Sequence, residues 1–417
     1  MADGRAEAAA MSAVSPGESA DSQVAVRGRS VTRIEIDGYR PFREFVAEPG
    51  DLTVIIGANA AGKSSLFDFL RFLSRAVQDP IPPEIDERSV GKLIFHSPGA
   101  ERIAFSVILD LGERLPFRYE AEILGPVGAP RVARERLATT LPLRLDESKP
   151  FALLDFAGGR GFVRDSIRTN LTRPAWSVGP NELVLRRALD PTLITLSKAQ
   201  ASISQWRFYS GFDVSTGASI RRPVPTDPSP ILEERGGNLS AVLMWLRDEQ
   251  PAAFEELGTH LRSAVPGFQS LNVKAKGGPG TVIGIWREAG VGAELTLADL
   301  SDGTLRLLCW AALCLSPNLP PLLCIDEPEL GLHPRVLPLL AGLFRLASAH
   351  TQVLVATHSP YFLAQFDLDE IAVMRREDGA ARFVRPSSSG ALRQAVEEIG
   401  GEAITRLHLS DELETLP

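Results

Sequence analysis

A glycine-rich segment near the start of the chain has the residue types that bind phosphate groups. Residues 57–64 fit the pattern Gly-x-x-x-x-Gly-Lys-Ser/Thr. In this pattern backbone N–H groups wrap a phosphate chain, the lysine meets its charge and the hydroxyl holds Mg²⁺. An apolar run at 54–56 and an apolar helical face after residue 65 predict a strand, a loop and a helix N-terminus, which together form an anion site. A glycine turn that fits by chance is the alternative, and these flanking elements argue against it.

Two adjacent carboxylates, Asp326 and Glu327, close a second apolar run at residues 322–325. The run predicts a buried strand with both side chains at its carboxyl end, where ligands bind in open α/β sheets. We expect Asp326 to hold Mg²⁺ and Glu327 to orient the water that attacks a γ-phosphate. An isolated Asp-Glu pair is more often a solvated acidic turn, so this interpretation depends on the other motifs.

A histidine follows a third apolar run. Residues 353–356 predict another strand, and His358 comes two positions after it. Its imidazole is expected to donate to the γ-phosphate and so to sense whether that group is present. A lone histidine is more often structural or simply exposed, so this role also depends on the order of the motifs.

The sequence Leu-Ser-Asp-Gly-Thr at residues 300–304 starts an apolar helical pattern over residues 305–315. Ser301 and Gly303 would therefore lie at a helix N-terminus, which is able to bind a phosphate. With this segment, which we call the signature, the four motifs resemble those of the ABC-type ATPases. The resemblance implies that Ser301 and Gly303 close over the ATP of a second protomer, which would make the site composite and the protein a homodimer.

Within that superfamily the chain resembles the RecF, OLD and SMC branch, as a stand-alone head of the AAA family ATPases. Residues 326–334 (Asp-Glu-Pro-Glu-Leu-Gly-Leu-His-Pro) and 357–360 (Thr-His-Ser-Pro) carry this resemblance. Residues 34–42 are similar to the first strand of the branch and to its aromatic-basic turn near the nucleotide. Two positions depart from common patterns, Ala60 where many members have glycine and Asp302 where transporter subunits have glycine.

The motifs and the resemblance together give an expected set of site residues. The catalytic residues would be Glu327, Lys63, His358 and Ser301, and the Mg²⁺ ligands Ser64 and Asp326. The expected ATP-binding residues are Gly57, Asn59, Ala60, Ala61, Gly62, Lys63, Ser64, Ser65, Ser301 and Gly303. The glutamine that usually couples lobe movement to Mg²⁺ is not identified, because Gln78, Gln200 and Gln205 all lack a diagnostic context.

The composition is that of a folded enzyme from a reducing compartment. The chain has 417 residues, 44% of them hydrophobic and 23% charged, and three cysteines that read as buried apolar residues. No run reaches the roughly 18 apolar residues of a membrane span, and no signal core is visible. We therefore expect a cytoplasmic protein with no membrane partner. The net charge of −8 argues against a DNA-coating protein, although the basic run at 131–136 could contact phosphates.

The expected fold is α/β, a P-loop NTPase of the ABC-ATPase type. It would have a mixed central sheet flanked by helices, with an antiparallel β layer and a helical lobe inserted between Lys63 and Ser301. Without sustained heptads we expect no coiled-coil arms, and the segment after His358 is too short for the TOPRIM nuclease domain of OLD-type proteins. The expected division is a disordered tail (1–29), an N-terminal core part (30–125), the inserted lobe (126–290), a C-terminal core part (291–375) and a tail (376–417) with a strand and a helix near 392–399.

The implied function is ATP hydrolysis that drives dimerisation of the heads. By resemblance this would serve DNA repair or defence against foreign DNA, with a separately encoded effector, and binding to DNA itself is left open. One alternative is the energy subunit of a membrane transporter, but such subunits usually carry Ser-Ala-Leu-Asp in place of residues 331–334. Another is a module that uses ATP only to hold a dimer together, and the presence of Glu327 argues against it.

Overall fold

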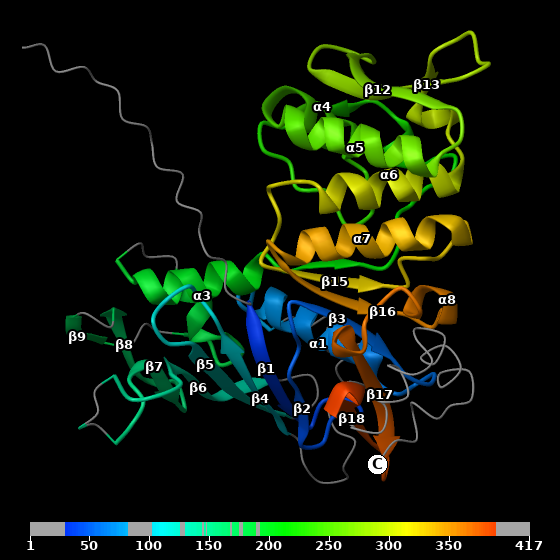
Figure 1. The fold of residues 1–417 in the computed structure, drawn as a ribbon. Coiled ribbons are helices and arrows are strands. Elements are labelled where there is room, and N and C mark those ends of the chain that lie inside the picture. The colour runs from blue at the N-terminus through cyan, green and yellow to red at the C-terminus, as the bar shows by residue number, and fades with distance from the viewer. Residues whose placement is uncertain are drawn as a thin grey trace, which may run out of the picture.

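The computed structural model describes residues 30–81, 102–125, 130–143, 146, 148–166, 169–174, 178–188 and 192–388. The strands of this described part form three sheets, stacked with helices between them (Figure 1). The central sheet has the strand order β10 (Arg207–Tyr209), β15 (Leu322–Asp326), β16 (Gln352–Ala356), β3 (Leu52–Ile56), β17 (Ile371–Glu377) and β18 (Ala380–Val384). Neighbouring strands from β10 to β17 are parallel and β18 is antiparallel, so the predicted mixed sheet is confirmed.

The strands of the central sheet are short and apolar because both of their faces are buried. Ile55 of β3 packs into one hydrophobic core and its neighbours Val54 and Ile56 pack into another. Strands β15 and β16 alternate in the same way. The apolar runs predicted from the sequence are therefore strands that separate two cores.

Helix α1 (Lys63–Ala76) lies between the central sheet and a large antiparallel sheet, and α3 (Ile194–Ser204) lies beside it. The buried residues of α1 recur at helical spacing, as Leu66, Phe69, Leu70 and Leu73 show. The antiparallel sheet has the strand order β2 (Phe45–Ala47), β1 (Val31–Asp37), β4 (Arg102–Leu109), β5 (Phe117–Leu124), β6 (Arg131–Thr139), β7 (Ala152–Ala157), β8 (Arg160–Ser166) and β9 (Thr169–Pro174).

Cross-strand ion pairs cover part of the outer face of the antiparallel sheet. Arg118 contacts Glu35 at 3.2 Å, and Arg136 lies 3.6 Å from both Glu120 and Asp155. Arg136 of β6 pairs with acids of its two neighbouring strands, whereas Arg118 of β5 reaches across β4 to β1, and such opposite charges stabilise a sheet modestly. Arg136, which belongs to the basic run singled out in the sequence, is thus matched by acids and does not give a bare basic surface.

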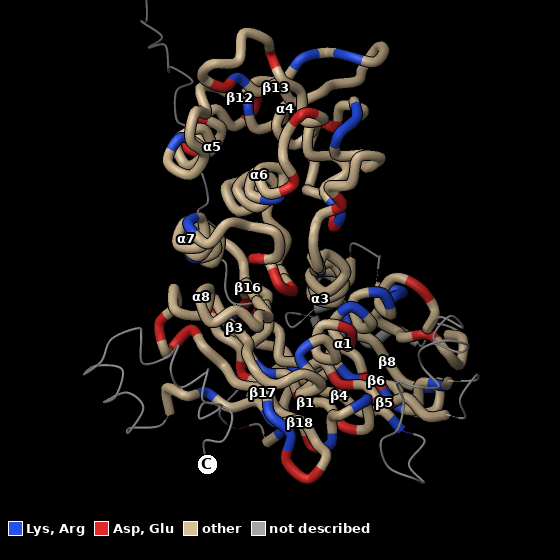
Figure 2. The backbone as a smooth tube through the Cα atoms, turned by 90° about the vertical axis from the view of Figure 1, so that its right-hand side faces the viewer, with Lys and Arg blue, Asp and Glu red and all other residues tan. Residues whose placement is uncertain are grey.

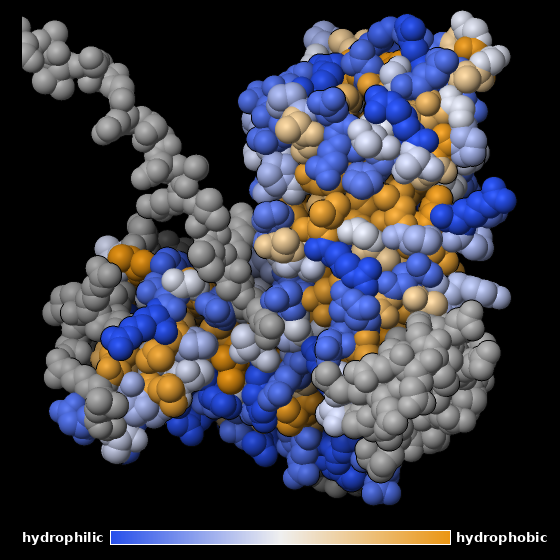
Figure 3. Space-filling model, viewed as in Figure 1, coloured by the Kyte–Doolittle hydropathy of each residue, from blue (hydrophilic) through white to orange (hydrophobic). Residues whose placement is uncertain are grey.

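The second face of the central sheet carries the helical part. In Figure 1, α7 (Leu337–Ser348) covers the sheet, α6 (Asp302–Cys314) lies above α7, and α4 (Leu239–Glu249) and α5 (Pro251–Ala264) lie above α6. The hairpin of β12 (Phe268–Ala275) and β13 (Thr281–Glu288) closes the stack, with β11 (Val224–Pro225) and β14 (Leu295–Thr296) pairing to β13. The helical lobe expected between Lys63 and Ser301 is present as α4 and α5. Hydrophobic residues show at the surface along α6 and α7 (Figure 3).

The remaining helical segments are short. They are α8 (Pro360–Leu363) and the 3₁₀ turns η2 (Val184–Arg187), η3 (Ser219–Arg221), η4 (Leu297–Asp299), η5 (Pro334–Val336), η6 (Leu368–Glu370) and η7 (Pro386–Ser388). Among the described residues, no helix is long and apolar enough to cross a membrane. The three cysteines are buried as predicted, and burial raises the pKa of each thiol.

The sheets do not follow the expected division of the chain. The border at residues 125 and 126 falls between β5 and β6, which are neighbours in one sheet. That sheet also contains β1 and β2, so it is not wholly an insertion, and β10 from the expected inserted lobe pairs with β15 of the central sheet. The division could not be predicted because strand pairing joins distant parts of the chain, and no local pattern in the sequence shows which strands will pair. The expected tail at 1–29 and the helix near 392–399 lie outside the described residues.

Candidate functional site

Three of the four predicted motifs follow three neighbouring parallel strands of the central sheet. Residue pairing sets Asp326 of β15 beside Ala356 of β16, and Ala356 beside Ile55 of β3. The carboxylates, His358 and the glycine loop (residues 57–62) therefore leave the sheet at the same edge. The order of the motifs along the chain gives no direct sign of this row, which the strand order β15-β16-β3 creates.

The glycine loop has a backbone shape that few residues adopt. Gly57 has φ 145°, and a Cβ on it would lie 1.9 Å from the carbonyl oxygen of Met374 in β17. Gly62 has φ 115° and directly precedes α1. Ala60, noted as a departure from glycine, has φ 66°, in the left-handed region where a side chain is strained. The loop is therefore closely fitted to β17 and strained at Ala60.

Lys63 lies in the first turn of α1 with its side chain buried. Its Nζ donates to the carbonyl oxygen of Gly57 at 2.5 Å and contacts that of Ala58 at 3.3 Å. The first turn of α1 has no acidic residue, so the helix N-terminus and this ammonium group act together on the loop. A phosphate chain needs a cation, amides at a helix N-terminus and a hydroxyl group. Lys63, the first turn of α1 and the exposed Ser64 supply these groups, and they fit ATP.

The carboxylates after β15 are crowded and partly buried. Burial and the neighbouring Glu327 raise the pKa of Asp326, while Lys63 and Arg71 lower it. Glu327 has φ 49°, and its N–H donates to the carbonyl oxygen of Ala356 at 2.8 Å. A left-handed glutamate held by the neighbouring strand is a strained arrangement of the kind that recurs at active sites. A half-buried carboxylate such as Asp326, crowded by the charge of a second one, fits a divalent cation such as Mg²⁺.

A third acid, Glu329, joins this turn to the histidine segment. Its Oε1 accepts a hydrogen bond from the buried hydroxyl of Thr357, which in turn accepts from the N–H of Ser359 at 3.0 Å. Thr357 and Ser359 flank His358, whose side chain is exposed. Glu329 is not among the predicted site residues, although it lies within the run 326–334 that carries the family resemblance. The only signal for it was its position in that run.

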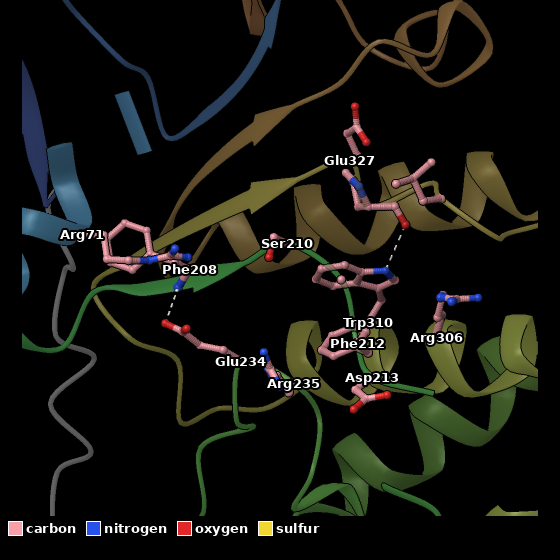
Figure 4. A pocket seen from close by; sticks show the side chains of 13 residues that line it. Arg71, Phe208, Ser210, Phe212, Asp213, Glu234, Arg235, Arg306, Trp310 and Glu327 are labelled. Atoms are coloured by element: carbon pink, nitrogen blue, oxygen red, sulfur yellow. Dashed lines mark hydrogen bonds between the residues drawn. The ribbon is translucent and has the colours of Figure 1, made fainter. Parts of the chain in front are cut away.

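A cavity of about 580 Å³ opens beside Glu327, between α1, the end of β10 and α6 (Figure 4). In its wall the indole N–H of Trp310 in α6 donates to the carbonyl oxygen of Pro328 at 3.1 Å. Opposite, the guanidinium group of Arg71 lies 5.1 Å from the ring centroid of Phe208. Acidic stretches of chain also show between α6 and β16 in Figure 2. The helical part and the carboxylate turn are thus joined directly at the site.

None of the three glutamines considered in the sequence lines this cavity. The amide of Gln78 donates to Ser74 O, and that of Gln200 donates to Val77 O, so both fasten the end of α1. Gln205 lies at the end of α3. The cavity is instead lined by Ser210, a polar residue that directly follows β10, the strand paired with β15. A three-residue edge strand such as β10 gives no clear pattern in sequence.

The signature forms the start of α6 as predicted. Ser301 precedes the helix, and its Oγ accepts from the N–H of Thr304 at 3.2 Å. A Cβ built on Gly303 would lie 3.1 Å from the carbonyl oxygen of Gly331, in the turn after β15. Ser301 is exposed, and its Oγ also lies 2.8 Å from Oγ1 of Thr304 in a hydrogen bond that either hydroxyl could donate, so a ligand outside the chain would compete with Thr304 for the Ser301 proton.

The aromatic-basic turn after β1 lies against the glycine loop but turns its aromatic ring inward. A Cβ on Gly62 would lie 3.2 Å from Pro41. The ring of Tyr39 is buried against Phe69, and Arg40 forms an ion pair with Asp68 of α1. The turn is therefore near the loop as expected, and it supports α1 rather than presenting a free ring.

Known proteins match the chain in family and in fold. The profile of a family described as "AAA domain, putative AbiEii toxin, Type IV TA system" matches residues 52–364. A crystal structure of an SMC head bound to the C-winged helix domain of ScpA has a TM-score of 0.56 at 16% identity, and the match covers 85% of this chain and 97% of that one. An SMC head with an extended coiled coil, bound to the C-terminal domain of ScpA from Pyrococcus furiosus, has a TM-score of 0.53 at 15% identity over 89% and 99%. No curated protein matches the chain.

Proposed function

The chain belongs to the AAA-domain family whose profile spans residues 52–364, with a head-like fold of the SMC and RecF branch of ABC-type ATPases, and we propose on this premise that it binds and hydrolyses ATP. The row of Asp326, Ala356 and Ile55 is the observation that carries the proposal. It sets the ends of three parallel strands beside one another, with a lysine loop, two carboxylates and a histidine directly after them.

The phosphates would lie in the glycine loop. Amides of residues 57–65 would donate to them, and Lys63 would leave the carbonyl oxygens of the loop to neutralise their charge. Ser64 and Asp326 would hold Mg²⁺, which supplies charge neutralisation during phosphoryl transfer. Since Asp326 is half-buried beside another carboxylate, its negative charge favours a bound cation.

Glu327 would orient and polarise the attacking water. Its left-handed backbone, held through its N–H by Ala356, fixes the direction of the side chain from the end of β15. His358 would donate to the γ-phosphate, and Glu329 would hold the segment that carries it through Thr357. The protein thus contributes positioning and charge, which are the main means of catalysis in phosphoryl transfer.

Ser301 and Gly303 would complete the site of a second copy, so that ATP joins two protomers and hydrolysis separates them. Both lie at an exposed helix start, with the hydroxyl and amides available for an anion. Two large apolar side chains lie next to the site motifs at the surface, Leu330 at 57% and Tyr361 at 71% exposure. Burial of such side chains against another protomer would favour a dimer.

The homodimer would act in defence against foreign DNA or in DNA repair, together with a separately encoded effector. The toxin–antitoxin description of the family supports the first of these roles, defence against foreign DNA. The two SMC heads are each bound to a domain of another protein, which supports a protein partner for this head as well. Duplex DNA is the second ligand that this role would involve.

The test is ATP turnover by the wild-type protein and by Glu327→Gln, each with and without duplex DNA. We expect turnover in the wild type, a loss of about 10²–10⁴-fold in the variant, and accumulation of the variant as an ATP-bound dimer. Stimulation by DNA in the wild type only would support action on DNA, while turnover unchanged by DNA would point to a protein partner. A Glu327→Gln protein with wild-type turnover would contradict the role of Glu327. A wild-type protein that binds ATP and dimerises without turnover would favour the non-hydrolysing module instead.

A further inference from the structure

An arginine outside every predicted motif makes extensive contacts with the signature. Arg221 ends η3, in the segment after β10, and its side chain is only 9% exposed. Its Nη1 donates to the carbonyl oxygens of Ala298 and Leu300, each at 2.9 Å, and lies 3.5 Å from that of Leu297. Its Nη2 donates to Asp302 at 2.7 Å. One guanidinium group therefore contacts four residues of the segment 297–302, which we call the signature loop.

The signature loop needs such support because it lacks a regular backbone ladder. It leaves η4 after Asp299 and enters α6 at Asp302, with Leu300 and Ser301 in extended conformation between them. Carbonyl oxygens that converge on one cation stabilise this bend, and a guanidinium group has enough fixed donors to satisfy several of them. Because Asp302 is 60% exposed, its ion pair contributes less than the bonds to the carbonyl oxygens.

The same side chain also contacts the segment beside the carboxylates. The Nε of Arg221 donates to the carbonyl oxygen of Val214 at 2.9 Å. The residues directly before Val214 line the cavity that contains Glu327 (Figure 4). Arg221 thus links the wall of one protomer's own carboxylate site to the loop that carries Ser301.

We propose that Arg221 is a positioning residue that holds the signature loop in the shape that meets the ATP of a second copy. The proposal rests on the composite ATP site described above. It goes beyond that site because Arg221 contacts no expected ligand and belongs to the segment after β10. The side chain of Arg221 bonds both to Val214, next to the cavity wall, and to Leu300, next to Ser301, so it fixes the two segments relative to each other.

The experiment compares Arg221→Ala, Arg221→Lys and the control Arg222→Ala, each added to Glu327→Gln. Arg222 is the adjacent arginine and is exposed. ATP-dependent dimerisation is measured by light scattering, and binding of a fluorescent ATP analogue by titration. We expect both Arg221 variants to bind the analogue within about 3-fold of the parent and to dimerise at least about 10-fold more weakly, because bonds from a charged donor are lost. The Arg222→Ala protein should behave like the parent.

Hydrogen exchange of the nucleotide-free proteins gives a second readout that does not depend on dimerisation. Amides of the signature loop (residues 297–302) should exchange faster in Arg221→Ala than in Arg222→Ala, while those of α1 should be unchanged. Unchanged exchange in the signature loop, or dimerisation of Arg221→Ala equal to that of the parent, would overturn the proposal. A parent that stays monomeric with ATP would count against the composite site, and the exchange result would still decide whether Arg221 holds the loop.

Discussion

Buried or partly buried acids occur in two regions of this molecule, and the two regions differ in how fully hydrogen bonds satisfy them. In the antiparallel sheet, Glu135 of β6 is fully buried and accepts hydrogen bonds from the hydroxyl of Tyr119 and from the N–H groups of Val184 and Leu185. The carboxylate therefore holds η2 against the sheet, with both oxygens satisfied. Such a group is costly to bury and is stable only because its donors surround it.

The acids at the end of β15 lack that protection. Asp326 lies beside Glu327, and Glu327 has a left-handed backbone. Within the described residues, Oε2 of Glu329 is buried without a hydrogen-bond partner. Burial raises the pKa of both Asp326 and Glu329. A satisfied buried acid thus marks structure, whereas crowded and strained acids at a strand end mark a site that a cation and a phosphate chain would complete.

The largest effect should come from removing the cation that faces the crowded acids. Lys63→Ala should weaken ATP binding by about 2–5 kcal/mol, because a buried ammonium group is lost from the phosphate loop. The matched control is Lys198→Ala, which removes an exposed lysine paired with Glu113 beside the antiparallel sheet. Titration with a fluorescent ATP analogue measures both. If the two variants bind ATP equally well, the glycine loop is not the phosphate site.

The second prediction concerns the pH dependence of stability that Glu135 imposes. Burial raises its pKa from 4.5 to about 7 in the folded protein, and its three hydrogen bonds only partly oppose this shift. The unfolded chain releases the proton near pH 4.5, while the folded chain keeps it until about pH 7. The free energy of unfolding should therefore fall as pH rises through this window, by up to about 3 kcal/mol from this group.

Urea denaturation at both ends of that window, with Glu135→Gln as the comparison, measures this effect. The glutamine has no proton to release, so its contribution should not change with pH. Turnover of ATP by the folded variant should stay within about 3-fold of wild type, because Glu135 lies in the structural region. An equal pH slope in both proteins would show that another group is responsible, and a large loss of turnover would break the distinction between the two regions.

The sequence was informative where a residue with a chemical role lies at or shortly after the end of an apolar strand. Lys63, Asp326 and His358 could be placed because a buried strand precedes each, and parallel strands bring such ends together. The assignment of Glu135 could not be made in this way. It stands between Arg134 and Arg136 in β6, so its charge predicts exposure although strand alternation puts it on the face of Leu137, and nothing local shows that donors 49 and 50 residues away enclose it.

Long-range polar contacts explain the other omissions. Arg221 and Asp302 are 81 residues apart, and Glu329 and Thr357 are 28 apart. Arg221, Glu329 and Thr357 lie in segments that follow β10, β15 and β16, which are neighbours in the central sheet. Since edge strand β10 is three residues long, its place in the central sheet, and hence the link from the cavity to the signature loop, had no periodic signal.

A smaller effect is expected from Glu329. Glu329→Gln should keep turnover within about 3-fold, because an amide oxygen still accepts from Thr357, whereas Glu329→Ala should lower kcat by about 10-fold by leaving that buried hydroxyl unsatisfied. The KM for ATP should change little in either, since Lys63 and its loop are untouched. Steady-state kinetics of the pair measures this. Equal losses in both variants would mean that the charge, and not the hydrogen bond, matters at this position.

The smallest effect tests whether strain is stored at the site. Ala60 and Glu327, both at the site, have positive φ, as do three other described non-glycine residues in turns and bends, Arg40, Glu44 and Asp378. Ala60→Gly should raise the free energy of unfolding by up to about 1 kcal/mol, because relief of the left-handed strain exceeds the added freedom of the unfolded chain. The neighbouring Ala58→Gly has no such strain to relieve and should lower it by about 0.5–1 kcal/mol. Equal shifts of the thermal midpoint in the two variants would show that Ala60 stores no strain, and the contrast between the regions would then rest on the acids alone.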